Sequence, residues 1–193
     1  MSDETPLSDS DLAVRAQGGD KLAFETLVER HKGPLFRFVR RSVGNDDDAY
    51  DVVQDSFVSA WLALLRFDSH KSFATWLRAI ALNKCRDYGR RQSVRRRFFR
   101  FLAPKDMEIS GETDVLLDQE QERQEAARLM ALDRAIAALP AFYKEPLLLT
   151  TVSGLSQQDA AAQLNTTPKA IEMRIRRARK KLTQIMGDAE TGQ

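Results

Sequence analysis

The spacing of apolar residues near the C-terminus constrains the fold of this chain more than any other feature. Between residues 168 and 182, aliphatic or small side chains recur at intervals of four, three and four residues, which places them on one side of an α-helix. These inward-facing residues are Ile171, Ile175, Ala178 and Leu182. Thr167 is suited to cap the start of this helix and Pro168 to occupy its first position. The opposite side of the helix is predominantly basic.

A shorter helix is predicted immediately before it. Ser156 and Asp159, three residues apart, form an acidic variant of the capping box at the start of a helix over 157–164. Three consecutive alanines in this helix permit a neighbouring helix to cross closely, and Asn165 begins a tight turn. A short helix with small residues, a tight turn and a basic helix make up the helix-turn-helix layout, whose second helix enters a groove of DNA.

The rest of the chain is also predicted to be helical. Apolar spacing predicts helices over 8–17, 21–39, 48–65, 73–91, 126–139 and 143–149. Pro34 predicts a kink or a break in the second of these, whereas Pro146 is expected in a first turn, where proline is tolerated. Tyr50 and Trp61 are assigned to the core face of the third. With 9 Gly and 6 Pro in 193 residues, the expected fold class is all-α.

Charge is strongly segregated along the chain, although the net charge is only +2. Residues 84–100 contain eight basic residues and one acidic residue, and residues 169–181 contain seven and one. Either run alone is more often a solvated helix face, but two runs that each end a helical pattern indicate binding of nucleic acid. Residues 101–124 are acidic and lack an apolar stripe. We therefore expect a flexible acidic linker between two small helical domains, at 8–100 and 125–187.

Several classes of function are disfavoured by what the sequence lacks. No apolar run approaches the roughly 18 residues of a membrane span, and the polar start of the chain carries no secretory signal. Cys85 is the only cysteine, which precludes an intramolecular disulfide and fits a reducing cytoplasm. Cys85, His31 and His70 have no metal-ligand spacing. Without paired carboxylates, a nucleophile with its base or a glycine-rich phosphate loop, we expect neither catalysis nor a cofactor or metal.

Four stretches, taken in order, resemble the extracytoplasmic-function group of the sigma-70 family of bacterial transcription initiation factors. They are 22–38, which begins Leu22-Ala23-Phe24-Glu25; 51–61, which begins Asp51-Val52-Val53-Gln54-Asp55; 73–83, from Phe73-Ala74-Thr75-Trp76 to Asn83; and 138–179, from Ala138-Leu139-Pro140 to Ala178-Arg179. The resemblance covers nearly the whole chain apart from the linker and the termini. Asn165, Glu172 and Met173 depart from the commonest family pattern.

The resemblance implies a protein that binds core RNA polymerase, recognises a two-part promoter and helps to melt it. The two domains would be sigma region 2 and sigma region 4, and their partners would be the clamp coiled coil and the flap region of polymerase, promoter DNA and an anti-sigma factor. Stress or envelope responses are the expected setting. The expected location is the cytoplasm, with no membrane insertion, although an anti-sigma partner could hold the protein at the inner membrane face.

The resemblance also assigns residues to three sites. The face for the clamp coiled coil consists of Asp51, Gln54, Asp55 and Val58. Contacts to the −10 element are assigned to Arg78, Asn83, Lys84, Arg86, Arg90 and Arg91. Contacts to the −35 element are assigned to Lys169, Glu172, Met173, Arg176, Arg177 and Lys180. Of these, Glu172 can accept a hydrogen bond from cytosine, and Met173 offers an apolar contact.

Two alternatives stay open at this point. A helix-turn-helix repressor or activator could use the C-terminal half alone, with a ligand-binding N-terminal half. In addition, Phe73 and Trp76 could stack on DNA bases beside the predicted loop 66–72, where similar proteins bind a flipped base. The spacing of these two aromatic residues favours the hydrophobic core instead.

Overall fold

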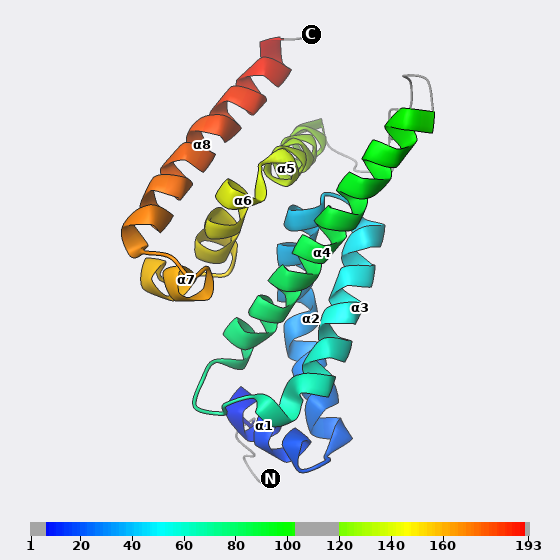
Figure 1. The fold of residues 1–193 in the computed structure, drawn as a ribbon, viewed down its shortest axis with the longest axis vertical. Coiled ribbons are helices and arrows are strands. Elements are labelled where there is room, and N and C mark those ends of the chain that lie inside the picture. Colours follow the sequence, from blue (N-terminus) through cyan, green and yellow to red (C-terminus); the bar gives the residue numbers. More distant parts are fainter. Residues whose placement is uncertain (1–6, 103–119, 192–193) are drawn as a thin grey trace.

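The computed structural model describes the backbone of residues 7–102 and 120–191 and the side chains of residues 7–95 and 127–187. Over these residues the chain forms helices and no strand, which confirms the all-α expectation. Helices α1 (Asp9–Gln17), α2 (Lys21–Val43), α3 (Asp46–Ala63) and α4 (Phe73–Leu102) pack together as the N-terminal unit. Helices α5 (Glu120–Ala138), α6 (Ala141–Leu147), α7 (Gln157–Gln163) and α8 (Pro168–Thr191) form the C-terminal unit beside it (Figure 1).

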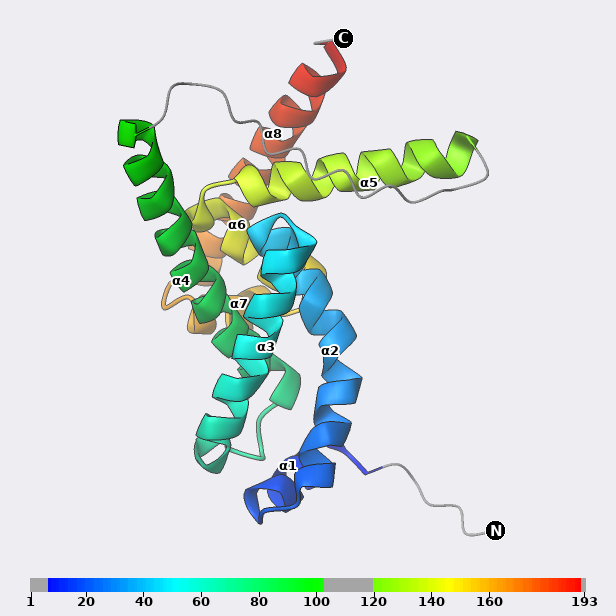
Figure 2. The same cartoon turned by 90° about the vertical axis from the view of Figure 1, so that its right-hand side faces the viewer.

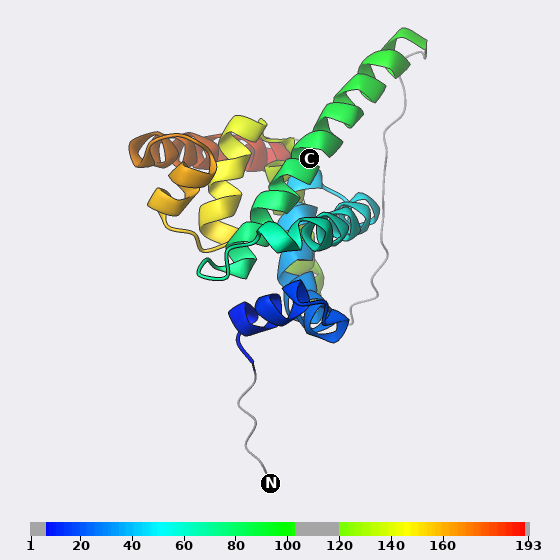
Figure 3. The same ribbon diagram turned by 60° about the horizontal axis from the view of Figure 1, so that its bottom comes forward.

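The expected acidic linker lies mostly outside the described residues, which omit 103–119. Its two ends are helical, since residues 101–102 finish α4 and residues 120–124 begin α5. Both basic runs also belong to longer helices than the apolar spacing predicts. Figure 3 shows the last part of α4 projecting beyond the helices it packs against.

Short polar side chains cap the starts of three helices of the N-terminal unit; α1 and α2 begin within one residue of the predicted position, whereas α3 begins at Asp46, two residues before the predicted start. Ser8 and Asp11 form both halves of a capping box at α1, and the Asp20 carboxylate accepts a 3.1 Å hydrogen bond from the Ala23 amide at the start of α2. The Asn45 side chain does the same for the Asp48 amide at 2.8 Å. Each bond satisfies an amide that has no partner within its own helix.

The core of the N-terminal unit lies between α2, α3 and α4. Phe38, Phe73 and Leu77 are each at most 2% exposed. The ring of Trp76 packs 4.9 Å from that of Phe67 and 5.6 Å from that of Phe73, centroid to centroid. Phe73 is therefore a core residue, as the spacing predicts, and Trp76 packs against the core while remaining partly exposed.

The structure corrects three expectations about this unit: a break at Pro34, and core positions for Tyr50 and for Trp61, which is 38% exposed. Helix α2 runs through Pro34 without a break. We attribute this to Leu27, Leu35 and Phe38, which are buried on either side of the proline and whose packing compensates for one missing backbone hydrogen bond. Tyr50 is 57% exposed instead of lying in the core, and its ring packs at the surface 4.5 Å from that of Phe36.

The C-terminal unit departs from expectation at Pro146. This proline lies near the end of α6 and not in a first turn. It cannot donate a hydrogen bond to the carbonyl of Phe142, and the chain continues as a π-helical segment, η2 (Leu148–Val152). Such π turns are rare and occur mostly as single turns within α-helices. Leu148 and Leu149 on this segment remain at most 1% exposed, so the apolar face is preserved.

The two units dock against each other. Figure 2 shows α5 lying across one end of the N-terminal unit, where it contacts α2. Buried residues of both units, including Cys85 of α4 and Leu139 of the C-terminal unit, belong to one continuous hydrophobic cluster. No helix among the described residues is long and apolar enough to span a bilayer.

Candidate nucleic-acid interface

The outer face of α8 is exposed over its full basic stretch. The Thr167 hydroxyl accepts a 3.2 Å hydrogen bond from the Ala170 amide, and the helix begins at Pro168, as the sequence predicts. Ile171, Ile175 and Ala178 are at most 8% exposed and seal the inner face. The six residues assigned to the −35 element are all exposed: Lys169, Glu172, Met173, Arg176, Arg177 and Lys180. This arrangement leaves the predicted DNA-reading surface open to solvent.

Helix α8 is held in place by α7 and α6. Ala160 and Ala161 of α7 are at most 2% exposed, which allows the two helices of the motif to cross closely. The guanidinium of Arg174 lies 3.9 Å from the centroid of the Phe142 ring and donates a 3.4 Å hydrogen bond to the Thr166 hydroxyl. Arg174 therefore ties the reading helix to α6 and to the turn, which fits its sideways projection from the predicted reading face.

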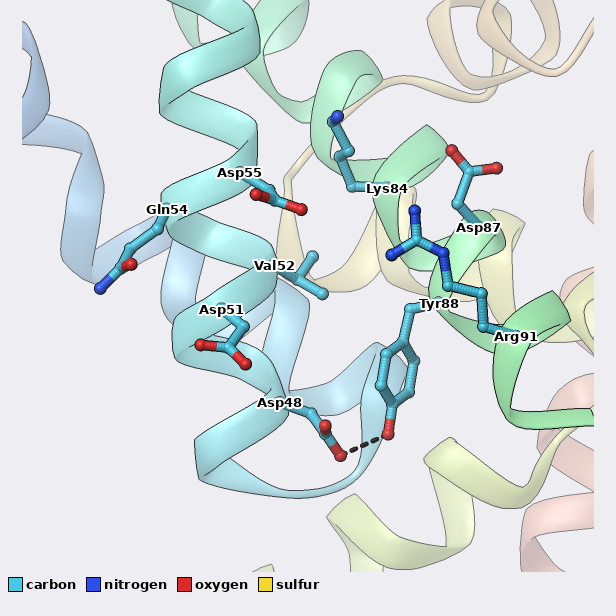
Figure 4. Close-up of a pocket in the computed structure, with 9 residues that line it drawn as sticks. All are labelled: Asp48, Asp51, Val52, Gln54, Asp55, Lys84, Asp87, Tyr88 and Arg91. Atoms are coloured by element: carbon cyan, nitrogen blue, oxygen red, sulfur yellow. Dashed lines mark hydrogen bonds between the residues drawn. The ribbon is translucent and has the colours of Figure 1, made fainter. Parts of the chain in front are cut away.

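The α3 face assigned to polymerase is a continuous exposed surface. Asp51, Gln54, Asp55 and Val58 are all exposed, while Val52, Ser56 and Phe57 on the other side of the helix are buried. Asp51, Gln54 and Asp55 also line a pocket between α3 and α4 (Figure 4). The other lining residues are Asp48, Val52, Lys84, Asp87, Tyr88 and Arg91.

The α3 wall of the pocket is acidic, whereas the α4 wall carries two basic residues and one acidic residue, Asp87. Asp48, Asp51 and Asp55 lie on α3, and Lys84 and Arg91 lie across from them on α4 (Figure 4). The Tyr88 hydroxyl donates a hydrogen bond to Asp48 and bridges the walls. The pKa of Tyr88 is raised by burial and then by this bond, so the hydroxyl stays a donor at neutral pH. The acidic wall continues onto the open α3 face, where a basic partner could reach it.

The six residues assigned to the −10 element do not share one face of α4. Lys84 and Arg91 face the pocket beside α3, and Arg90 is paired with Asp87. Arg78 is half-buried, and burial lowers the pKa of its guanidinium. Asn83 and Arg86 do not line this pocket and are joined by a 3.1 Å hydrogen bond from Arg86 to the Asn83 side-chain oxygen. Helical spacing could have revealed this division, because Lys84 and Arg91 are seven residues apart and Arg86 lies between them.

Arg86 is engaged by the C-terminal unit. Its Nε and a terminal nitrogen donate hydrogen bonds of 2.7 and 2.6 Å to the two carboxylate oxygens of Glu145 on α6. This parallel, two-bond geometry is the strongest form of an arginine–carboxylate contact. The bonds to Glu145 raise the pKa of Arg86. Glu145 is 13% exposed, so the pair is largely withdrawn from water on the carboxylate side.

Two further polar contacts join the units, and no sequence motif marks their C-terminal members. Asp133 of α5 accepts hydrogen bonds from Arg40 and Arg41 at the end of α2. The ammonium of Lys144 donates 2.8 Å hydrogen bonds to the carbonyls of Ser42 and Ala137. Burial lowers the pKa of Lys144. Residues separated by about a hundred positions make these contacts, and no local pattern marks them.

The described residues contain no cluster of three or more His, Cys, Asp or Glu side chains that could hold a metal ion. Cys85 is buried beside Ser42, Lys144 and Glu145, and burial raises the pKa of its thiol to about 11. A thiol with this pKa is protonated at neutral pH and is a poor nucleophile.

Comparisons with known proteins agree with this organisation. Residues 27–95 match the Sigma-70 region 2 family, and residues 129–182 match Sigma-70, region 4. The chain is 38% identical to the RNA polymerase sigma factor NccH of Alcaligenes xylosoxydans xylosoxydans over 96% of this chain and 98% of the relative. It is 32% identical to the ECF RNA polymerase sigma-E factor of Salmonella typhimurium, over 90% and 91% of the two chains.

Solved structures give the same result. The structure of CnrH in complex with the cytosolic domain of CnrY matches with a TM-score of 0.66 and 35% identity, over 93% of this chain and 97% of CnrH. The sigma factor RpoE of Bartonella quintana, solved in complex with the anti-sigma factor NepR, has the same fold, with a TM-score of 0.64 and 24% identity over 85% and 96% of the two chains.

Proposed function

The chain belongs to the extracytoplasmic-function group of the sigma-70 family of RNA polymerase sigma factors, and on that premise we propose a division of labour among three of its helix faces. The α3 face binds core polymerase, α4 contacts the −10 element and α8 reads the −35 element. The protein directs transcription initiation through these contacts and performs no covalent chemistry itself. The observation that carries this proposal is the fully exposed outer face of α8 over a sealed inner stripe.

The α3 face suits a basic coiled coil of polymerase. Asp51 and Asp55 supply negative charge, Gln54 supplies a hydrogen-bonding group, and Val58 is 59% exposed and supplies apolar area. Carboxylates on an open face accelerate encounter with a basic partner and discriminate against acidic ones. The acidic α3 wall of the pocket beside this face adds further carboxylate oxygens for a basic side chain of that partner. The flap region of polymerase is the corresponding partner of the C-terminal unit.

The α8 face suits the major groove. Arg176 and Lys169 can donate hydrogen bonds to guanine, Glu172 can accept one from cytosine and Met173 can pack on a thymine methyl. Arg177 and Lys180 supply positive charge for phosphates. Glu172 is paired with Lys169 at 3.3 Å in the free chain, so either residue must exchange this surface pair for a contact to a base.

Control by an anti-sigma factor is the expected regulation. The relative CnrH forms a complex with the cytosolic domain of CnrY. We propose that a comparable partner covers the polymerase-binding and DNA-binding faces of this chain until a stress or envelope signal removes it. The protein then works in the cytoplasm, and a membrane-anchored partner would hold it at the inner face of the inner membrane.

Reconstitution with core RNA polymerase tests the proposal. We expect a stoichiometric complex and initiation at a defined set of promoters, found by mapping transcript starts after overexpression and then transcribing those promoters with purified components. A helix-turn-helix repressor would bind its operator without polymerase. Failure to form a complex with core polymerase would therefore reject the assignment of the α3 face and favour that alternative.

A further inference from the structure

We propose that the two units form a closed state in which Arg86 is hydrogen-bonded to Glu145. Docking of the C-terminal unit against α4 and contact of Arg86 with DNA therefore exclude each other. The inference rests on the proposed function, which assigns Arg86 to DNA. It adds a masking contact within the chain itself, independent of any partner protein. We call the three polar contacts between the units the latch: Arg86 with Glu145, Arg40 and Arg41 with Asp133, and Lys144 with the Ser42 carbonyl.

The Arg86–Glu145 contact uses the same atoms that a phosphate requires. Arginine binds carboxylates and phosphates through one planar fork of two N–H donors. In the closed state both donors of that fork point to Glu145 at 2.7 and 2.6 Å. The remaining terminal nitrogen donates to the side-chain oxygen of Asn83, which is itself assigned to the −10 element. Two of the assigned DNA-contacting residues are thus engaged within the protein.

The contact cannot be shared between Glu145 and DNA while the units stay docked. Glu145 is 13% exposed, and a phosphate on Arg86 would leave this carboxylate without its cation and beside a second negative charge. Leaving a mostly buried carboxylate unpaired is strongly unfavourable. Binding of DNA at Arg86 therefore requires the C-terminal unit to move away from α4. The apparent affinity for DNA falls by the fraction of molecules that are open.

The other latch contacts stabilise the same docked arrangement at a distance from Arg86. Asp133 is 17% exposed and accepts hydrogen bonds from both Arg40 and Arg41. Lys144 crosses from α6 to the end of α2. A change at Asp133 should consequently open the units and free Arg86, although it touches neither Arg86 nor Glu145.

Cys85 provides a native probe of opening. It is the only cysteine in the chain, it is 7% exposed, and Ser42, Lys144 and Glu145 surround it. Separation of the units removes the side chains of Lys144 and Glu145 from its surroundings. The rate at which a thiol reagent such as 5,5′-dithiobis(2-nitrobenzoate) modifies Cys85 therefore reports the open fraction. No cysteine or other probe has to be introduced.

The experiment compares the full-length wild type with Glu145→Gln and Asp133→Asn. Each variant removes one charge and keeps the shape of the side chain. Glu25→Gln is the charge-matched control, because Glu25 is exposed on α2 and has no ion-pair partner among the described residues. For each protein we would measure the rate of thiol modification and the affinity for a fluorescent dT12 oligonucleotide, whose phosphates suffice for contacts that do not depend on sequence.

We expect both latch variants to raise the rate of thiol modification and the oligonucleotide affinity at least about fivefold, as for other coupled sites. Glu25→Gln should leave the thiol rate unchanged and should alter the affinity only through the loss of one negative charge. Unchanged thiol rates in both latch variants would overturn the closed state. Faster thiol modification with unchanged oligonucleotide affinity would overturn the masking of Arg86. Assembly with core polymerase, measured in parallel, should be equal in all four proteins; its absence from the wild type would reject the proposed function while leaving the thiol result intact.

Discussion

Gly44 at the end of α2 lies so close to α5 that a Cβ atom on it would stand 2.8 Å from the Cβ of Ala137. Gly44 has a φ of +99° and ends α2 in the left-handed conformation, with its amide donating to the Arg40 carbonyl. One residue thus combines a helix cap with a close approach of the two units. Both roles require glycine, because any side chain is strained at this φ and also collides with α5.

Gly44→Ala should therefore destabilise the protein more than an alanine at an open glycine of similar conformation. Gly19 is the matched control, because its φ is +96° and a Cβ atom there would meet nothing within 4 Å. We expect Gly19→Ala to cost about 1–2 kcal/mol of unfolding free energy from backbone strain alone, and Gly44→Ala to cost about 1–3 kcal/mol more from overpacking. Urea unfolding of the two variants measures the difference. Equal losses would show that α5 yields freely at this contact.

The local structure of this chain could be predicted from its sequence because each signal spans only a few residues. The Ser156 cap and the Thr167–Pro168 helix start depend on neighbours within one turn. Ser156 accepts from the Asp159 amide, while the Asp159 carboxylate accepts from the Ser156 hydroxyl and not, as in a capping box, from its amide; the start of α8 occurs as predicted. Pro34 misleads because the backbone hydrogen bond that it removes stabilises the helix less than the packing of α2 in the core does. Tyr50 misleads for a related reason. Helical spacing places it on the apolar face of α3, but spacing alone does not show which part of that face other helices cover.

The docking of the two units could not be predicted, because it depends on pairs that are distant in sequence. Arg40 and Asp133 are 93 residues apart, and Arg86 and Glu145 are 59 residues apart. Nothing within a few residues of Glu145 or Asp133 distinguishes them from solvated acids. The exposed faces of α3 and α8 were predictable, since they follow from helical periodicity, whereas the engagement of Arg86 emerges only when the units are placed together.

Asp55→Ala should weaken assembly with core polymerase and leave the reading of promoter DNA by α8 intact. Asp55 is exposed and lies at the junction of the α3 face and the pocket, where it would meet a basic group of the partner. Loss of such a contact typically costs about 1.4 kcal/mol, a tenfold weaker Kd. Titration of labelled protein with core polymerase measures the Kd. Glu25→Ala removes an exposed acid elsewhere and should bind normally; a loss of the same size there would mean that net charge, and not this face, determines affinity.

Arg176→Ala and Lys180→Ala should affect DNA binding in different ways. Both side chains are exposed on the outer face of α8, but Arg176 is proposed to reach base edges and Lys180 a phosphate. Loss of a base contact should cost about 1–3 kcal/mol and relax the preference at one promoter position. Loss of a phosphate contact should weaken binding to all sequences alike and reduce the salt slope by about 1.

Holoenzyme binding to a set of single-position −35 variants, repeated at several salt concentrations, separates these two effects. Assembly with polymerase should be unaffected in both proteins. The same uniform loss in both would show that α8 contributes charge but no sequence preference, which would contradict the assignment of Arg176.

The stability of the docked chain should fall at alkaline pH through Cys85. Burial raises the pKa of this thiol from its ordinary value of 9.0 to about 11, so the folded protein retains a proton that the unfolded chain releases between these values. The stabilisation from the protonated thiol is complete below pH 9 and is lost as the pH rises through 11. A shift of this size corresponds to about 2–3 kcal/mol. Urea unfolding of the wild type and Cys85→Ala from pH 8 to pH 11 measures it.

Subtraction of the two pH profiles isolates the cysteine. Burial lowers the pKa of Lys144, so the unfolded chain binds the extra proton and this lysine makes stability rise with pH over the same range. Cys85→Ala retains the burial of Lys144, so that opposite dependence cancels in the difference, whereas the charge interaction between Cys85 and Lys144 remains part of it. The wild type should lose its advantage over Cys85→Ala progressively above pH 9. A difference that stays constant up to pH 11 would mean that the thiol ionises as readily in the folded protein as in the unfolded chain, and that the interface around Cys85 is already open to water.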